Sequence, residues 1–366
     1  MAGWTELGNI WNTFKEIDIR PIAEEAERPI LLAVVGADGV GKTTLIAALC
    51  HDKRAREKII TPTIEANLDA AQQLDPADLT VLMVDAARND FAAEAELCRA
   101  WQKAGRTVLI FYNKMDTLVN VNALNPLPTW CDARVVYGSA TDSDSLTTLF
   151  VPRVLDLVRN RHLALARHYP LFRLAAARHL ILDTSLANAT YSLSTGLAEI
   201  VPALNIPFNV TDMIVLTKNQ ALMVYKLGLM LGLSTRWQEH MAELGSVIGA
   251  GFLWRQLARE LIGLIPGWGI VPKVAIAYAG TYAVGEAILR WYQTGHKASG
   301  KGMKEIYAEA LTRGKQVAQE LIARTPKPKL SKPALPKPRK IICPNCGKVN
   351  PKDARFCAYC ATGLSH

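Results

Sequence analysis

The 366-residue sequence has few of the features that mark an exported protein or an enzyme with a side-chain nucleophile. Its first twenty residues lack the basic start, apolar middle and small-residue cleavage site of a secretory signal, so we expect a cytoplasmic protein. The seven histidines are scattered without the spacing of metal ligands. No serine or cysteine nucleophile lies beside an evident base. These absences argue against a secreted protein and against nucleophilic catalysis.

The net charge is small over most of the chain, and the excess of basic residues is concentrated in one segment. Half of the residues are hydrophobic, and the length allows two or three domains with cores of their own. The formal net charge is +9, but residues 324–340 contain seven basic side chains and no acid, which leaves about +2 for the rest. Alternating proline and lysine predict that this segment is an extended linker, with basic residues Arg324, Lys327, Lys329, Lys332, Lys337, Arg339 and Lys340.

Cysteine is rare except at the carboxyl end, where four of the seven cysteines fall within the last 24 residues. Two C-x2-C pairs separated by ten residues can supply four thiolates to one tetrahedral zinc ion, and so short a segment has no core without metal. The pattern resembles the zinc ribbons of many bacterial proteins. Disulfides and a rubredoxin-like iron site are the alternatives. The predicted zinc ligands are Cys343, Cys346, Cys357 and Cys360.

Residues 29 to about 140 alternate between apolar strands and helices. The runs "ILLAVVG", "LTVLMVDA", "TVLIFYNK" and "ARVVYGSA" are continuously apolar, which is typical of parallel strands covered by helices on both faces. The sequence therefore predicts an α/β domain with a mostly parallel sheet, followed by an all-α apolar region and a small zinc ribbon.

The stretch "GADGVGKT" fits the phosphate-binding pattern G-x-x-x-x-G-K-[ST] between a strand and a helix. In such a loop, backbone N–H groups surround the phosphates and Lys42 reaches the terminal phosphates. The Thr43 hydroxyl can ligate magnesium. The predicted phosphate-binding residues are Gly36, Asp38, Gly39, Val40, Gly41, Lys42, Thr43 and Thr44.

Two further motifs follow at the ends of later strands. "NKMD" places Asn113, Lys114 and Asp116 where a carboxylate can accept two hydrogen bonds from guanine N1 and its exocyclic amine, a donor pair that adenine lacks. "YGSA" places Ser139 and Ala140 after the next strand, where backbone amides can contact the guanine carbonyl. The three motifs in this order predict binding of GTP or GDP with Mg²⁺.

Residues 29–160 thus resemble the Era-like GTPases, a branch of the translation-factor-related class. The resemblance implies a loop of the form DxxG that senses the γ-phosphate, and this loop is not found. Residues 59–77 are too few for the usual switches and strands, so either an edge pair of strands is lost or the switch is abbreviated, with Thr61 or Thr63 as a vestigial magnesium-sensing threonine. No catalytic residue can be named. We therefore expect a GTP-binding protein with weak intrinsic hydrolysis.

From Asp142 onward the sequence is helical. Residues 206–292 resemble an uncharacterised apolar domain found behind Era-like GTPase domains in bacteria, which implies association with, or insertion in, the inner membrane. Residues 244–292 fit either buried helices of a compact bundle or a hairpin that enters a membrane, with two short helices expected around Pro266–Pro272. An apolar stripe over residues 4–17 predicts an amphipathic helix that packs on the neighbouring domain or binds a membrane.

The expected organisation has five parts: a lead-in (1–28), a GTPase domain (29–160), a helical domain (161–323), a linker (324–340) and a zinc ribbon (341–366). The leading hypothesis is a GTP-binding protein whose nucleotide state changes how the helical domain contacts a membrane, a protein partner or a second copy. The alternative is an adaptor, stabilised by nucleotide, that acts through the basic linker and zinc ribbon on nucleic acid or protein. Nucleic acid is the less favoured partner because the tail has few aromatic residues.

Overall fold

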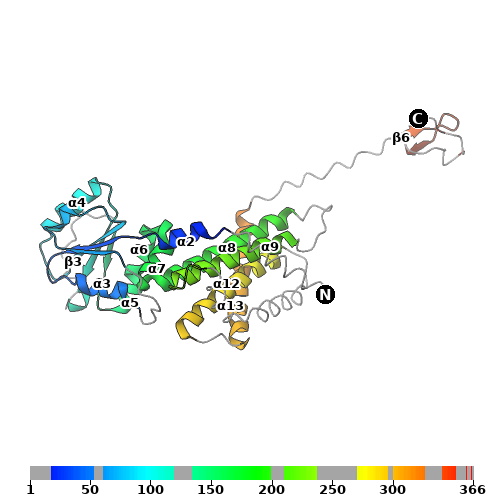
Figure 1. Cartoon of the computed structure of the whole chain (residues 1–366). Helices are drawn as coiled ribbons and strands as arrows, with labels where there is room; N and C mark the ends of the chain where they lie inside the picture. Colours follow the sequence, from blue (N-terminus) through cyan, green and yellow to red (C-terminus); the bar gives the residue numbers. More distant parts are fainter. Residues whose placement is uncertain are drawn as a thin grey trace. The chain divides into compact units, whose positions relative to one another are not determined.

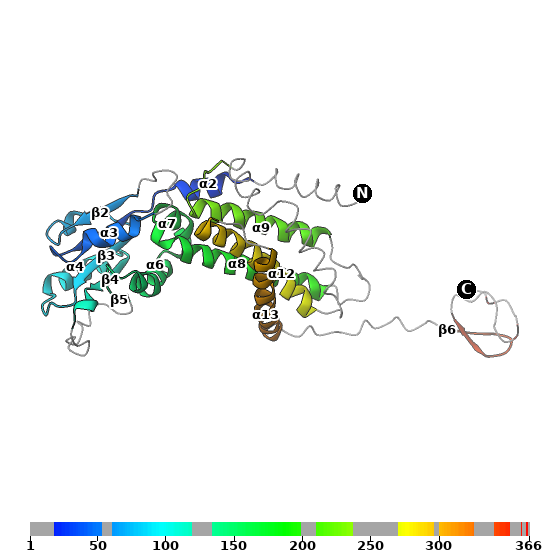
Figure 2. The same cartoon turned by 90° about the horizontal axis from the view of Figure 1, so that it is seen from below.

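A computed structural model describes residues 18–52, 61–118, 134–198, 210–236, 270–295, 300–325 and 340–351, together with Cys360 and Leu364. The chain divides into two compact units, residues 1–322 and 323–366. The predicted helix over residues 4–17 and the first part of the apolar stretch 244–292, up to residue 269, lie outside the described residues. Figures 1 and 2 show the first unit with its sheet at one end and long helices beside it.

The amino-terminal part of the first unit contains an all-parallel sheet of five strands in the order β2-β1-β3-β4-β5. The strands are β1 (Leu32–Gly36), β2 (Thr63–Ala66), β3 (Leu79–Asp85), β4 (Val108–Asn113) and β5 (Val135–Tyr137). The α/β class and the parallel sheet are therefore confirmed. β3 and β4 are buried almost throughout, as the continuous apolar runs predict.

The short region between α3 and β3 supplies one strand. β2 pairs in parallel with β1 at the edge of the sheet, with Thr63 opposite Leu32 and Ala66 opposite Val35. A 3₁₀ turn, η1 (Ala71–Gln73), follows it. In the part of the region that the structure describes, one strand and one turn are thus present where the resemblance implies two strands.

Helices cover both faces of the sheet. One face packs against α3 (Lys42–Cys50), α6 (Val151–Leu157) and α7 (His162–His168), with Leu45, Phe111 and Phe150 fully buried between them. The other face packs against α4 (Ala92–Lys103) through Trp101. Short elements complete this part: α2 (Arg20–Glu27), η2 (Met115–Thr117), α5 (Ser143–Ser145), η4 (Leu146–Phe150), η5 (Arg159–Arg161) and η6 (Pro170–Phe172).

In the described residues after α7 and η6, four long helices follow: α8 (Arg173–Ala198), α9 (Val210–Met230), α12 (Ile270–Thr294) and α13 (Gly300–Arg324). Figures 1 and 2 both show α8, α9 and α12 side by side, and their buried residues form a second core. Tyr225 and Leu229 of α9 also belong to the core beneath the sheet, so the helices and the sheet share apolar contacts.

α12 corresponds to the end of the most apolar stretch of the sequence. It is one continuous helix whose first turn contains Pro272, a position where proline breaks no helical hydrogen bond. The two short helices predicted around Pro266–Pro272 are therefore not seen from Ile270 onward, and the preceding part lies outside the described residues. Across the described ranges, no helix combines the length and apolarity needed to cross a bilayer.

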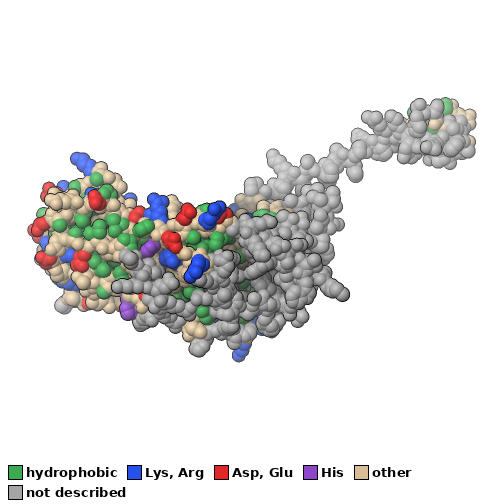
Figure 3. Space-filling model, in the orientation of Figure 1, with side chains coloured by type: hydrophobic (Ala, Val, Ile, Leu, Met, Phe, Trp, Pro, Cys, Tyr) green, Lys and Arg blue, Asp and Glu red, His purple; other side chains and the backbone are tan. Residues whose placement is uncertain are grey.

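The surface of the first unit carries mixed charge where it is described. On the face drawn in Figure 3, acidic and basic side chains are interspersed over the sheet and the adjoining helices. This agrees with the near-neutral charge predicted for the folded parts outside the linker. The second unit contains a two-stranded antiparallel ribbon, β6 (Lys340–Ile342) and β7 (Val349–Pro351).

Candidate functional site

The loop between β1 and α3 has the backbone shape that its glycines predict. A Cβ atom at Gly36 would lie 2.6 Å from the carbonyl oxygen of Met83 on β3, so only glycine fits there. Gly41 has φ +99°, a left-handed conformation that disfavours other residues. The loop therefore leads directly into the N-terminus of α3, where unpaired backbone N–H groups favour an anion.

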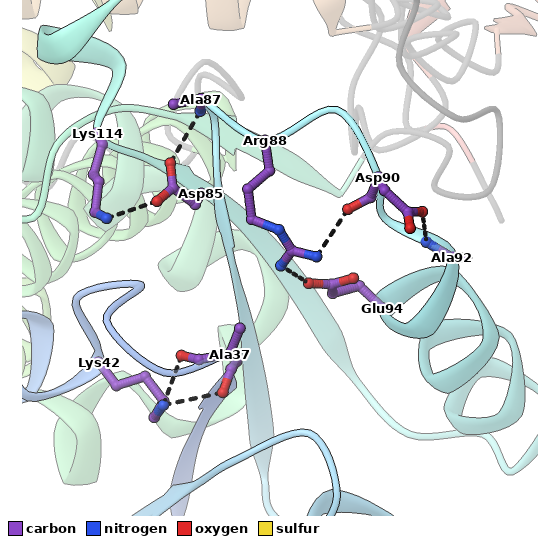
Figure 4. Close-up of polar contacts among 10 residues, drawn as sticks. Ala37, Lys42, Asp85, Ala87, Arg88, Asp90, Ala92, Glu94 and Lys114 are labelled. Carbon is purple, nitrogen blue, oxygen red and sulfur yellow. Dashed lines mark hydrogen bonds and ion pairs between the residues drawn. The ribbon is translucent and has the colours of Figure 1, made fainter.

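Lys42 folds back over this loop. Its side chain is only 6% exposed, and its ammonium donates to the carbonyl oxygens of Gly36 at 3.0 Å and Ala37 at 2.9 Å (Figure 4). Asp38 is exposed at the tip of the loop, with one carboxylate oxygen 4.0 Å from the same ammonium. A lysine ammonium and a helix N-terminus thus meet at one loop, which is a suitable arrangement for an oligophosphate.

The side chain of Asn113 joins three segments of the sequence. Asn113 ends β4 and is 3% exposed. Its amide nitrogen donates to the carbonyl oxygen of Val40 at 2.8 Å, and its amide oxygen accepts from the backbone N–H of Ala140 at 2.7 Å. The loop after β1, the end of β4 and the loop after β5 are therefore tied together by one buried carboxamide.

Lys114 and Asp116 lie in the turn that follows. Lys114 is the one non-glycine residue with positive φ in the described part of the chain, at +66°, a strained conformation that recurs at functional sites. Its ammonium donates to a carboxylate oxygen of Asp85, at the end of β3, at 2.6 Å (Figure 4). Burial opposes ionisation of Asp85, but the Lys114 ammonium and the Ala87 N–H hold its pKa below the usual value. Asp116 is exposed in η2.

Glu65 is a candidate site residue that the motif search misses. The Thr43 hydroxyl, in the first turn of α3, donates to a carboxylate oxygen of Glu65 on β2 at 2.8 Å. Both side chains are exposed. One signal in the sequence was available, because Glu65 is the only acidic residue between residues 59 and 68.

The two threonines predicted as magnesium sensors bond elsewhere. The Thr61 hydroxyl donates to the carbonyl oxygen of His168 at 3.0 Å, and the Thr63 hydroxyl donates to the Tyr169 hydroxyl at 3.4 Å. Asp78, in the same abbreviated region, accepts from the Leu31 N–H and from Arg161, which is a structural role. Glu65 is thus the acidic residue that the structure brings to Thr43.

The remaining predicted positions surround the same edge of the sheet. Gly39 has φ +69°, Val40 is buried, and Thr44 is exposed on α3. Ser139 is 5% exposed, and its hydroxyl lies 2.8 Å from that of Thr141. Because the strands are parallel, the loops at their carboxyl ends meet along one edge, where α/β proteins place their ligands.

The second unit brings three of the four predicted zinc ligands together. The thiols of Cys343, Cys346 and Cys360 lie within 4.8 Å of one another, and those of Cys343 and Cys360 are 3.6 Å apart. Zinc–sulfur bonds of about 2.3 Å in a tetrahedron would separate two thiolates by about 3.8 Å, so this spacing fits zinc. Cys357 lies outside the described residues.

A tight turn sets the first pair of thiols. The Gly347 N–H donates to the carbonyl oxygen of Cys343, and the Cys343 N–H donates to that of Lys348, both at 2.9 Å. Gly347 has φ +69°. Cys343 and Leu364 form the small buried core of the unit. Few apolar residues are buried in the described part of this unit, which is typical of small domains that a structural zinc ion stabilises.

Comparisons with known proteins agree with this assignment for the tail. The chain finds no match among curated proteins. Residues 342–364 match the family model of the zinc-ribbon domain. The matched segment contains all four cysteines of the predicted site. The carboxyl-terminal part of the chain therefore belongs to the zinc-ribbon domains.

Proposed function

We propose that the sheet domain, residues 29–160, binds GTP and GDP in the manner of the Era-like GTPases and hydrolyses GTP weakly. On this proposal, the bound nucleotide changes how the helical region contacts a partner or a membrane surface. The phosphates would occupy the loop from Gly36 to Thr44, and the base would lie between Lys114, Asp116 and the loop of Ser139 and Ala140.

The side chain of Asn113 is the observation that most supports this proposal. Each of the three sequence motifs is weak by itself, but a single buried carboxamide bonds to the phosphate-loop carbonyl of Val40 and to the N–H of Ala140. A base-binding loop and a phosphate-binding loop must be held at a fixed separation to accept one nucleotide. Asn113 supplies that connection with two hydrogen bonds in a buried setting.

Asp116 supports guanine as the base. It follows Asn113 by three residues and is exposed in η2, at the edge of the sheet where the phosphate loop also lies. Its carboxylate can accept from guanine N1–H and the exocyclic amine, whereas adenine offers no such donor pair. The ion pair between Lys114 and Asp85 supports the turn that presents this carboxylate.

The oxygens of Thr43 and Glu65 fit a magnesium ion. Magnesium prefers hard oxygen ligands and binds proteins through one or two side chains plus the phosphates of a nucleotide. A hydroxyl and a carboxylate 2.8 Å apart, beside the N-terminus of α3, offer such a set. When bound, the ion would neutralise phosphate charge, and Glu65 would take the part of the acidic residue that is missing from the sequence motifs.

Weak hydrolysis follows from what these contacts do. Lys42 and Asn113 bond to carbonyl oxygens of the phosphate-binding loop, and Thr43 bonds to Glu65. Hydrolysis additionally requires a group that orients water at the γ-phosphate. We propose that a partner, or a rearrangement on binding, provides this group. GTP held without rapid turnover would give the helical region a long-lived signal.

The deciding experiment is calorimetric titration of the full-length, zinc-loaded protein with GTP and with ATP in magnesium, followed by an assay of released phosphate. We expect tight binding of GTP, much weaker binding of ATP and little phosphate over the first hour. Equal affinity for the two nucleotides would refute the role of Asp116. Rapid multiple turnover by the protein alone would refute the proposed weak hydrolysis.

A further inference from the structure

The short connection between α7 and α8 contacts both elements that contain the proposed magnesium ligands. We call residues 168–173 the 168–173 corner. Thr43 lies at the beginning of α3, and Glu65 lies on β2. The distance between their side chains therefore depends on how α3 and β2 are placed relative to each other. The 168–173 corner bonds to the opposite end of each element.

The corner bonds to α3 through a buried ion pair. Arg173 is 4% exposed, and its guanidinium donates to the carboxylate of Asp52, two residues after the end of α3. The same guanidinium donates through Nε to the carbonyl oxygen of Ala166 at 3.3 Å. A buried, charge-assisted hydrogen bond has a restricted geometry. It fixes the end of α3 that lies about 10 Å from Thr43 along the helix.

The corner bonds to β2 through two neighbouring residues. The Tyr169 hydroxyl donates to the carbonyl oxygen of Pro62 at 2.7 Å, and the Thr61 hydroxyl donates to the carbonyl oxygen of His168 at 3.0 Å. The Tyr169 ring is fully buried. These bonds fix the beginning of β2, within four residues of Glu65. The end of α3 and the beginning of β2 therefore both bond to the 168–173 corner.

Arg173 also reaches the helical bundle. Its Nη1 atom donates to the hydroxyl of Tyr292, in the last turn of α12, at 2.9 Å. One guanidinium thus contacts the carboxylate that follows α3 and a hydroxyl of α12, 119 residues away in the sequence. A movement of α12 that displaces Tyr292 must change the bonding of Arg173, and hence the position of Asp52.

We propose that Arg173 is a positioning residue for the magnesium site, and that its bond with Tyr292 couples nucleotide binding to α12. This inference rests on the proposed function. The coupling is reciprocal. Magnesium and GTP hold Thr43 and Glu65 close together, and this requires one placement of α3 against β2. The position of α12 favours or disfavours that placement through Arg173. The coupling acts on magnesium-dependent binding in particular.

The test uses Tyr292→Phe in the full-length protein, because this change removes a hydroxyl and keeps the partly buried ring. The readout is the magnesium ratio, defined as the dissociation constant for GTP in EDTA divided by that in magnesium. We expect Tyr292→Phe to lower this ratio at least about fivefold, the lower end of typical allosteric coupling. Tyr282→Phe makes the same change at an earlier position of α12 and is the matched control. It should leave the ratio within about twofold of the wild type.

A second variant guards against a general loss of folding. Arg173→Lys keeps a positive charge, but a single ammonium cannot replace both Nη1, which contacts Asp52 and Tyr292, and Nε, which donates to Ala166. It should therefore lower the ratio in the same way. In a Glu65→Gln background, Tyr292→Phe should have no further effect on the ratio, because the ligand that it positions is gone.

The possible results are distinct. A ratio equal to that of the wild type in Tyr292→Phe would overturn the coupling, and so would equal weakening of GTP binding in magnesium and in EDTA, which indicates a merely structural role. A wild-type protein that binds GTP but shows no magnesium dependence would overturn the role of Glu65 and Arg173 while leaving nucleotide binding intact. A wild-type protein that binds no GTP would overturn the proposed function itself.

Discussion

Replacing Asn113 by alanine is the sharpest test of the proposed nucleotide site. The change removes the donor to the Val40 carbonyl at 2.8 Å and the acceptor for the Ala140 N–H at 2.7 Å. Both bonds are buried, and a buried polar group without its partner costs about 1–3 kcal/mol. The two groups together raise the free energy of the assembled site by about 2–6 kcal/mol, which predicts a loss of GTP affinity of at least about 25-fold at 1.4 kcal/mol per tenfold.

Two measurements separate the contributions of the two bonds. Calorimetry gives the affinity for GTP, and amide hydrogen exchange at Ala140 reports whether its N–H keeps an acceptor. Asn113→Asp is the informative companion, because aspartate still accepts from Ala140 but places a carboxylate oxygen against the Val40 carbonyl. We expect Ala140 to stay protected in Asn113→Asp while GTP affinity falls as in Asn113→Ala.

A control in the same loop is available. Thr141→Ala removes the hydroxyl that lies 2.8 Å from that of Ser139 but leaves the Asn113 bonds in place, and it should change GTP affinity less than threefold. The reasoning would be refuted if Asn113→Ala bound GTP as tightly as the wild type with unchanged protection of Ala140. The three motifs would then not act as one site.

Three further predictions concern the base, the zinc site and the buried phenol. Asp116→Asn should shift preference from guanine to xanthine nucleotides, and unchanged preference in a competition titration would count against the guanine assignment. Cys343→Ser should lower the zinc content from one ion per chain to less than half in metal analysis; a full complement of zinc would place the ion elsewhere. Burial raises the pKa of Tyr169 to about 12 from 10.0, so the unfolded chain ionises first and stability is lost between pH 10 and 12. Between pH 10 and 12, the unfolding free energy of Tyr169→Phe, measured with denaturant, should fall by about 2–3 kcal/mol less than that of the wild type. An equal fall in the two proteins would contradict this prediction.

The convergence of the predicted motifs follows from local sequence signals. Apolar runs long enough for buried strands predict a parallel sheet, and a parallel sheet brings the loops after its strands to one edge. Gly36 and Gly41 adopt the backbone that the phosphate-loop pattern requires. Asn113 and Ala140, 27 residues apart, then meet because β4 and β5 pair directly.

Glu65 illustrates what the sequence could not provide. The strand "TIEA" has four residues and little hydrophobic character, so its pairing with β1 is set by tertiary contacts rather than by pattern. A DxxG pattern requires an aspartate, and the nearby Asp78 bonds to Leu31 and Arg161 instead of Thr43. A motif defined by spacing does not find an acid that a four-residue edge strand brings to Thr43.

The contacts of the 168–173 corner also lay beyond sequence analysis, and they alter how the domain boundary near residue 160 is understood. A boundary drawn from the change between alternating strands and continuous helix suggests two modules joined by a hinge. Arg173 and Tyr169 instead bury their polar groups against residues 52 and 62, and α9 contributes Tyr225 to the core beneath the sheet. Buried polar bonds and a shared core oppose independent motion of the two parts. A change at the proposed magnesium site would therefore reach the helices through small shifts of packed elements, which is why conservative changes such as Tyr292→Phe are the appropriate probes.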